Sequence, residues 1–466
     1  MNTNKRIIRA LVVICLLFLS LMTYLVWFNM FQADEVASSP YNKRQWEDER
    51  YVKRGNIYSS EGNLLAETIV DGDSRIRNYP RGNLYCHVIG YYSQVYGKSE
   101  LEMSYDDELM GKGDINLTIN EMRSGYDLYL SVIDELQEYA YELMDGRRGA
   151  VVAMEPTTGQ ILAMVSLPDF DPNTSSLEQE WSEMVEQENS PFLPRATQGL
   201  YPPGSTYKIV TASAAYENGM SDEVFEDTGG FRQGDVSVDN YGGSVYGTLD
   251  VREAFIVSSN QVFCELGYEL GADRVKSAAE KFGVNKEFSF DIPVSKSEIQ
   301  YSNMSDLDAA LVSIGQGGLV MTPLQVAMIG SSVANNGVML QPYIVEQVVT
   351  SSGTIMYQHE VTPLYNVMSA DCAAFLQDMM TGVVEERNGT GRSAQIRGID
   401  VAGKTGTAET DSGDDHAWFV GYAPADDPKI CVAVVLENDG NAGGTTAGPI
   451  ARDVMRKFLD ISGYDY

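Results

Sequence analysis

A serine and a lysine three residues apart are the first residues in this sequence that could do chemistry. The segment Tyr201-Pro202-Pro203-Gly204 ends an irregular stretch, and a helix-like run, 205–218, follows it. Ser205 and Lys208 then share one face of the first helical turn. A serine hydroxyl is a weak nucleophile unless a neighbouring base takes its proton. Because the 466 residues include only three histidines, the candidate base is Lys208, with a pKa lowered by burial or by a second cation.

Two further short motifs follow along the chain. Ser258-Ser259-Asn260 precedes an apolar run, and Gly403-Lys404-Thr405-Gly406-Thr407 lies in a predicted strand. Taken alone, S-x-x-K occurs roughly once or twice by chance in a chain of this length, and the S-S-N segment is typical of a helix cap. Lys404 could supply the second cation, and Gly406 would let a ligand backbone approach closely. S-x-x-K, S-x-N and K-T-G in this order are the signature of penicillin-binding proteins and serine β-lactamases.

Composition excludes several other functions. Asp and Glu number 66 against 33 Lys and Arg, which gives a formal net charge of −33. Nucleic acid is therefore not an expected partner, because phosphates need basic patches. The histidines lack metal-ligand spacing, and the five cysteines are far apart with no C-x-x-C pair. We expect no metal, no other cofactor and no disulfide framework.

The N-terminus predicts a membrane anchor. Lys5, Arg6 and Arg9 precede an uncharged apolar run, 10–28, and about 20 such residues span a bilayer core. The basic flank should stay in the cytoplasm, so that the catalytic part is extracytoplasmic. A cleaved signal peptide is the alternative, but this run is longer than a usual signal core and no small-x-small site follows it. We predict a cytoplasmic stub, 1–9, and a single-pass transmembrane anchor, 10–31.

The remaining chain is long enough for two domains. In the first, 32–148, short strand-like runs with a hairpin turn at Glu61-Gly62-Asn63 precede a helical pattern from about Glu121 to Met144. The second, 149–466, opens with a predicted hairpin and ends in a helix after Gly448-Pro449. Its predicted strands are 150–154, 160–165, 400–409, 416–423 and 429–437. We therefore expect a sheet assembled from both ends of this domain.

Beyond these motifs, the chain resembles class B penicillin-binding proteins, in a short form of the FtsI or PbpA type. The matching phrases run from about residue 54 to the end of the chain. They are Arg54-Gly55-x-Ile57, Leu101-Glu102, 149–154, Arg195-Ala196, Gly315-Gln316-Gly317, 321–325, Gly389-Thr390-Gly391 and 416–422. The resemblance implies an α/β transpeptidase domain of the penicillin-binding and serine β-lactamase type, with a sheet flanked by helices. An elongated, mixed α/β pedestal resembling a dimerisation domain would precede it.

The resemblance also implies a serine-type D-Ala-D-Ala transpeptidase that cross-links peptidoglycan and is a target of β-lactam antibiotics. Ser205 would attack the carbonyl between two terminal D-alanines of a stem peptide, with Lys208 as base. Ser258 would relay a proton to the leaving amine, helped by Lys404. Asn260 would hold Lys208 and the substrate amide. An amine from a neighbouring stem peptide would then resolve the acyl-enzyme.

Substrate binding is implied for the K-T-G-T strand. Thr405 and Thr407, beside Gly406, would bind the terminal carboxylate. The backbone N–H groups of Ser205 and Thr407 would form the oxyanion hole, where the loss of one donor typically costs ~10²–10³ in rate. The family usually carries Asp-Arg after R-G-x-I-x, where this chain has Ser59-Ser60. That segment belongs to the pedestal, so the departure concerns partner contacts.

Several alternatives stay open. A D,D-carboxypeptidase, in which water resolves the acyl-enzyme, carries the same motifs. A β-lactamase needs no pedestal, and a β-lactam sensor adds membrane spans. The pedestal, about 115 residues, is too short to hold a glycosyltransferase domain, so we expect a separate multi-spanning membrane glycan polymerase as a partner. A protein that only scaffolds and activates this polymerase is the remaining alternative. The sequence does not distinguish cell division, cell shape and sporulation as the setting.

Overall fold

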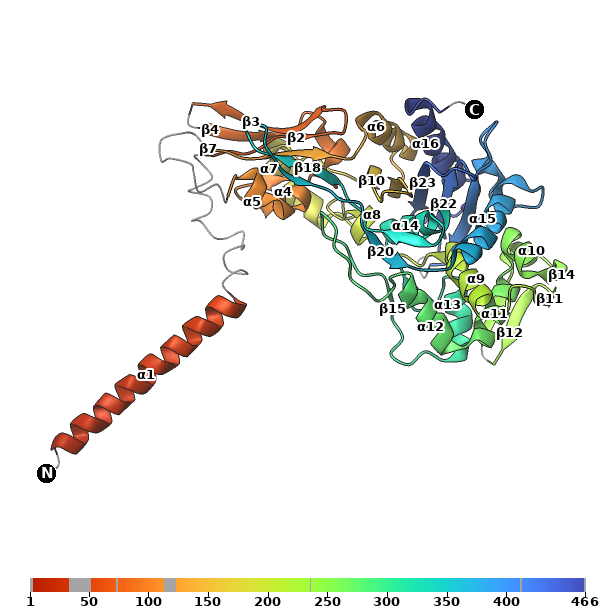
Figure 1. Ribbon diagram of the computed structural model, residues 1–466, viewed down its shortest axis with the longest axis horizontal. Helices are drawn as coiled ribbons and strands as arrows, with labels where there is room; N and C mark the ends of the chain where they lie inside the picture. The colour runs from red at the N-terminus through yellow and green to blue at the C-terminus, as the bar shows by residue number, and fades with distance from the viewer. Residues whose placement is uncertain are drawn as a thin grey trace.

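The structure is a computed structural model that describes residues 3–32, 52–72, 74–112, 123–234, 236–410 and 413–464. The N-terminal helix α1, Thr3–Phe31, is seen at the red end of Figure 1. Its segment Lys5–Phe28 is long and apolar enough to cross a membrane. The expectation of one N-terminal apolar helix is confirmed, and this helix suggests a single-pass membrane anchor.

A five-stranded antiparallel sheet forms the centre of the C-terminal part, in the order β10-β9-β23-β22-β21. Its first hairpin is β9, Gly149–Met154, and β10, Ile161–Leu167. The other strands are β21, Ala402–Ala408, β22, His416–Ala423, and β23, Ile430–Leu436. β9 pairs directly with β23, so the two ends of the domain build one sheet, as the sequence predicts.

Both faces of this sheet are covered by helices, which explains why its strands are apolar almost throughout. On one face, α6, Asp134–Met144, and α16, Ala447–Ile461, pack against Val151, Val432 and Val434. On the other face, α14, Pro323–Ala334, packs with residues such as Val152 and Ala433. Figure 1 shows α16 and α6 together on one side of the sheet and α14 with α8 on the other.

A mainly helical region lies between β10 and β21. Besides α14, its α-helices are α7 (Thr174–Glu186), α8 (Arg195–Gln198), α9 (Lys208–Glu217), α10 (Val251–Ile256), α11 (Asn260–Leu270), α12 (Ala272–Lys281), α13 (Asp306–Ser313) and α15 (Ala370–Glu385). Two hairpin-like pairs lie among them: β11 (Val224–Asp227) with β14 (Gly247–Asp250), and β12 (Gly230–Gln233) with β13 (Val236–Asp239). The short strands β15 (Glu298–Ile299), β16 (Leu319–Val320), β17 (Val338–Leu340) and β20 (Pro363–Asn366) complete it.

The N-terminal part contributes to a six-stranded mixed sheet in the order β19-β18-β8-β2-β3-β4. Strands β2 (Ile57–Tyr58), β3 (Leu64–Asp71), β4 (Ser74–Asn78) and β8 (Asp127–Leu130) come from the predicted pedestal. The predicted hairpin at Glu61-Gly62-Asn63 joins β2 to β3. Strands β18 (Val345–Val349) and β19 (Ile355–Gln358) come from far along the chain and complete the sheet.

The prediction of one continuous helix from about Glu121 to Met144 is wrong in its first half. Residues 121 and 122 lie outside the described part, Asp127–Leu130 is strand β8, and only Asp134–Met144 is helical. Leu128 and Leu130 are buried while Asp127 and Tyr129 are half-buried, which is the alternation of a strand. Pairing with β18 and β2 decided the structure of a segment whose apolar residues also fitted a helix.

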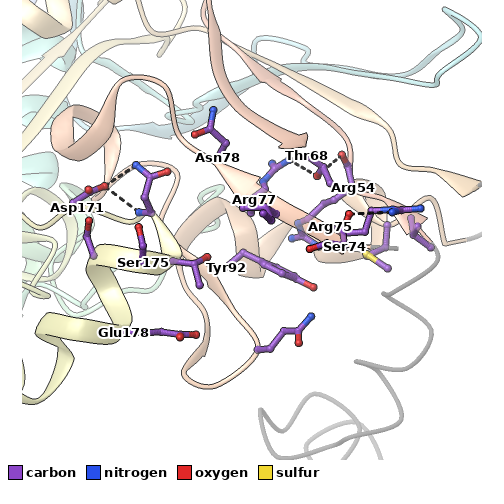
Figure 2. A pocket seen from close by; sticks show the side chains of 17 residues that line it. Arg54, Thr68, Ser74, Arg75, Arg77, Asn78, Tyr92, Asp171, Ser175 and Glu178 are labelled. Carbon is purple, nitrogen blue, oxygen red and sulfur yellow. Dashed lines mark hydrogen bonds between the residues drawn. The ribbon is translucent and has the colours of Figure 1, made fainter. Parts of the chain in front are cut away.

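Two motif segments of the N-terminal part meet in a buried ion cluster. Glu102 accepts hydrogen bonds from Arg54 Nε at 2.5 Å and from Arg77 Nε at 2.6 Å, and all three side chains are at most 4% exposed. A methyl group at position 55, next to Arg54, would lie 1.9 Å from the Tyr126 carbonyl oxygen, so this position requires glycine. A cavity of about 1280 Å³ beside this cluster, between β4 and the start of α7, is shown in Figure 2. None of the predicted catalytic residues lines that cavity.

Candidate active site

Ser205 lies in a single 3₁₀ turn, Gly204–Tyr207, that runs directly into α9. Ser205 is half-buried, and Lys208, the first residue of α9, is fully buried. The backbone N–H of Lys208 donates to the Ser205 carbonyl, so the two residues belong to one continuous turn. The expected placement of Ser205 in the first helical turn is confirmed, with tighter 3₁₀ geometry.

Close backbone contacts hold this turn against strand β21. Gly204 has φ +53°, and a methyl group there would lie 2.6 Å from the Thr407 carbonyl oxygen. Only glycine permits both the left-handed backbone and this approach. Trp418, on the neighbouring strand β22, donates from Nε1 to the Pro202 carbonyl at 3.0 Å. The backbone of the Ser205 turn therefore lies directly beside the backbone of Thr407.

Two of the predicted residues, Lys208 and Lys404, converge on the hydroxyl of a third, Ser258, and a fourth, Asn260, contacts Lys208. Lys404 Nζ donates to Ser258 Oγ at 2.8 Å, and Lys208 Nζ lies 3.3 Å from the same oxygen. Lys208 Nζ also donates to the Ser258 carbonyl and to Asn260 Oδ1, both at 2.8 Å. Residues separated by up to 196 positions in the sequence thus form one hydrogen-bonded group.

The turn that presents Ser258 is strained and capped. Ser258 has φ +61°, a backbone conformation that costs a residue other than glycine roughly 1–2 kcal/mol. Ser259 is the N-cap of α11 and accepts from the Val262 N–H at 3.1 Å. The S-S-N segment therefore caps a helix, as expected. It also holds Ser258, whose hydroxyl lies between the two lysines, in a left-handed backbone conformation.

Burial changes the acid–base chemistry of both lysines. Desolvation lowers the pKa of Lys208 to about 7, although the nearby Cys264 and Asp227 act in the opposite direction. Desolvation also lowers the pKa of Lys404 well below its usual value, and the charge of Lys208 adds to this effect. A lysine with a pKa near neutrality can lose a proton and act as a general base.

The two threonines of the K-T-G-T segment both lie on β21, but they differ in exposure. Thr405 is 7% exposed, and its hydroxyl shares a 2.7 Å hydrogen bond with the hydroxyl of Thr390. Thr407 is half-buried and lies beside the Ser205 turn. A methyl group at Gly406 would lie 3.0 Å from the Pro203 carbonyl oxygen, so glycine at this position leaves room for the turn that carries Ser205. Both hydroxyls are on the strand expected to bind a carboxylate.

A second buried network supports the segment before Ser205. Glu437 accepts from the Tyr201 hydroxyl at 2.5 Å, from Arg195 Nε at 2.6 Å and from Arg148 Nη2 at 2.7 Å. Arg195 is 1% exposed, so its charge depends on Glu437 for compensation. This network connects the end of β23 to α8 and to the residue that begins the Y-P-P-G-S segment.

Some residues that organise the site were not found from the sequence. Asp227 and Asn240 are buried and hydrogen-bond to Ser259 and Asn260 from the β11–β13 region. Thr390 belongs to a segment, Gly389-Thr390-Gly391, that resembles the family, but nothing in the sequence indicates its contact with Thr405. No spacing rule would have found them, because each contact depends on how distant loops fold together.

The fold and the site together define a penicillin-binding type of serine acyltransferase domain. The family model of the penicillin binding protein transpeptidase domain matches residues 149–456, and that of the penicillin binding protein A dimerisation domain matches residues 54–125. The chain therefore belongs to the class B penicillin-binding proteins.

Individual relatives cover almost the whole chain. It is 35% identical to the peptidoglycan D,D-transpeptidase PbpA of Mycolicibacterium smegmatis, over 98% of this chain and 99% of that protein. Among solved structures, it is similar to a D,D-transpeptidase domain from Eggerthella lenta, with a TM-score of 0.80, 36% identity, and coverage of 89% of this chain and 99% of that one. It is also similar to the penicillin G acyl-enzyme complex of penicillin-binding protein A from M. tuberculosis, with a TM-score of 0.81, 31% identity, and coverage of 87% and 99%.

Proposed function

We propose that this protein is a peptidoglycan D,D-transpeptidase that cross-links stem peptides through an acyl-enzyme on Ser205. The observation that carries the proposal is the convergence of Lys208 and Lys404 on the Ser258 hydroxyl beside the Ser205 turn. Its relatives support the proposal, since PbpA of M. smegmatis is a peptidoglycan D,D-transpeptidase and penicillin-binding protein A of M. tuberculosis forms a penicillin G acyl-enzyme.

In the acylation step, neutral Lys208 takes the proton of the Ser205 hydroxyl as its oxygen attacks the carbonyl carbon of the penultimate D-alanine. The negative charge on the carbonyl oxygen is stabilised by the backbone N–H groups of Ser205 and Thr407. The C–N bond then breaks, and Ser258, assisted by Lys404, passes a proton to the departing D-alanine amine. A pKa of about 7 suits Lys208 to accept and release this proton near neutral pH.

In the second step, the amine of a neighbouring stem peptide attacks the ester carbon and gives up a proton to Lys208. The C–O bond to Ser205 then breaks, and the proton returns to the Ser205 oxygen. Thr405 and Thr407 bind the terminal carboxylate of the donor peptide, on the strand where Gly406 keeps the backbone accessible. Asn260 holds Lys208 through its Oδ1 atom, and contacts the substrate amide. β-Lactams acylate the same serine because they present a reactive carbonyl to the same groups.

The membrane arrangement is part of the proposal. The basic residues at the start of α1 keep the N-terminus in the cytoplasm, so the catalytic domain lies outside the membrane, where the wall is built. The predicted division into stub, 1–9, anchor, 10–31, pedestal, 32–148, and transpeptidase domain, 149–466, fits this arrangement. Glycan chains come from a separate multi-spanning membrane polymerase that the anchor and pedestal contact.

The experiment that tests this function supplies the full chain in detergent with nascent glycan that bears pentapeptide stems. A transpeptidase produces cross-linked dimers together with free D-alanine, and both products disappear in Ser205→Ala. Release of D-alanine without dimers would instead identify a D,D-carboxypeptidase. Absence of both products from folded protein that does not react with penicillin would contradict acyl transfer altogether and favour the scaffolding role.

A further inference from the structure

A buried carboxylate lies beneath the Ser258-containing turn. Asp227, at the end of β11, is 1% exposed. It accepts from the Ser259 hydroxyl at 2.5 Å, from Asn240 Nδ2 at 2.9 Å to each oxygen, and from the Gly229 N–H at 2.9 Å. Within the described ranges, no lysine or arginine forms an ion pair with it. A buried carboxylate held only by neutral donors is costly and calls for a function.

The contacts of Asp227 extend to the S-S-N segment from two directions. One is direct, through Ser259, the cap of α11. The other passes through Asn240, whose Oδ1 accepts from the N–H groups of Asn260 at 2.8 Å and Gln261 at 3.1 Å. Ser258 has a left-handed backbone that surrounding contacts must enforce, and these two connections hold the residues that follow it, while Lys208 holds its carbonyl.

Asp227 also provides a negative charge close to the general base. Its charge raises the pKa of Lys208, against the dominant effect of burial. The other titratable groups that interact with Lys208 are Cys264 and Lys404, and Glu265 interacts with Asp227. When Lys208 takes the serine proton, Asp227 is the buried carboxylate near the new ammonium ion.

We propose that Asp227 is a positioning residue for acyl transfer: it fixes the Ser258–Asn260 turn and stabilises Lys208 once that lysine has accepted the proton of Ser205. This function parallels that of the aspartate in a Ser-His-Asp triad, which orients the base and stabilises its protonated form. The inference rests on the proposed acyl transfer at Ser205.

The test measures the second-order rate of acylation by a labelled penicillin between pH 5 and 9, using the full chain in detergent. We expect Asp227→Asn to slow acylation by about 10²-fold, the size of effect produced by misplacing a catalytic group by about 1 Å. We also expect the midpoint of the acid limb to move to lower pH, because protonated Lys208 has lost its stabilising charge. Ser259→Ala removes one contact and keeps the charge, so it should slow acylation without moving the midpoint.

Asp291→Asn is the matched control. Asp291 also accepts from a hydroxyl, that of Tyr105 at 2.5 Å, and from two backbone N–H groups, those of Ile344 at 2.6 Å and Val345 at 3.0 Å. This variant should acylate at the wild-type rate. An equal loss in both aspartate variants, a wild-type rate in Asp227→Asn, or a slower rate with an unmoved midpoint would each overturn the proposal.

Two further measurements keep the outcome interpretable. If Asp227→Asn does not fold, Asn240→Ala tests the proposal instead, because this substitution removes the connection from Asp227 to Asn260. Slower acylation is expected, and a wild-type rate would contradict the proposal. Wild-type protein and Ser205→Ala are measured alongside. If wild-type protein is not acylated, the proposed function fails. If wild-type protein is acylated and Asp227→Asn is acylated at the same rate, this inference fails and the proposed function stands.

Discussion

Lys404 donates a 2.8 Å hydrogen bond to the hydroxyl of Ser258, although the two residues are 146 positions apart in the sequence. The same hydroxyl is 3.3 Å from Lys208 Nζ, so one oxygen connects the two buried lysines. Two ammonium groups around one buried hydroxyl repel each other, and desolvation disfavours both charges. The arrangement therefore favours a neutral lysine, which a serine nucleophile needs as its base.

The acylation rate should depend on pH through Lys208. With a pKa of about 7, Lys208 is mostly protonated at pH 6 and mostly neutral at pH 8. The second-order rate of penicillin acylation should rise about tenfold per pH unit below 7 and reach a plateau above it. Stopped-flow measurements with a fluorescent penicillin from pH 5 to 9 would give this profile.

Replacing Lys208 gives the corresponding control. Lys208→Arg keeps a permanent positive charge and should lower the rate by about 10²–10⁴-fold, the usual contribution of a general base. Lys281→Arg alters an exposed lysine paired with Glu217 and should leave the rate unchanged. A flat pH profile in the wild-type protein would show that Lys208 is not the titrating base.

The glycine before the nucleophile should be irreplaceable for a reason beyond its backbone angle. Gly204→Ala would place a methyl group 2.6 Å from the Thr407 carbonyl oxygen and should separate the Ser205 turn from β21. We expect acylation to fall by about 10²-fold as the oxyanion donors move apart.

Gly219→Ala provides the comparison for the backbone effect alone. Gly219 has φ +76°, but a methyl group there meets nothing within 4 Å. This variant should lose about 1–2 kcal/mol of stability in a denaturant titration and retain the wild-type acylation rate. Equal acylation by both alanine variants would contradict the steric explanation.

The network around Glu437 should make stability sensitive to acid. Burial alone would raise the pKa of Glu437, but the hydrogen bond from Tyr201 and the charges of Arg195 and Arg148 outweigh it, so this pKa is lowered. A carboxylate with a lowered pKa stabilises the folded state above its ordinary value of 4.5, and this contribution is lost as the pH falls through its lower folded value.

Glu437→Gln should therefore destabilise the protein at pH 7 by about 3–5 kcal/mol, because the buried Arg195 loses its partner. The variant should also lose less further stability than wild type as the pH falls below 4.5. Asp427→Asn removes an exposed ion pair with Lys429 and should cost at most about 1 kcal/mol. Urea titrations at several pH values would measure both variants, and equal losses at pH 7 would refute the explanation.

Much of the central fold could be predicted because its signals are local. The strand β22, His416–Ala423, has the predicted bounds, and the hairpin of β9 and β10 follows from two apolar runs around a turn. The leucines of Asp127–Leu130 fit the period of a helix as well as that of a strand, and strand pairing decides between the two. The joining of β18 to β8 was not predicted, because it crosses from the second predicted domain into the first and no local pattern in either strand indicates its partner.

The site was predicted in part for a similar reason. The order of three motifs was enough to bring Lys208, Ser258 and Lys404 together as candidates, and their side chains lie within hydrogen-bonding distance. Asp227 and Asn240 carry no comparable motif. Their importance follows from burial and from hydrogen bonds that only the folded chain defines.

Acylation of the full chain by a labelled penicillin, compared with Ser205→Ala, tests the central claim most directly. The proposed mechanism predicts a covalent adduct on the peptide that contains Ser205, found by mass spectrometry, which is slow to hydrolyse and absent from the folded mutant. An adduct on another residue, or no adduct on folded wild-type protein, would contradict it.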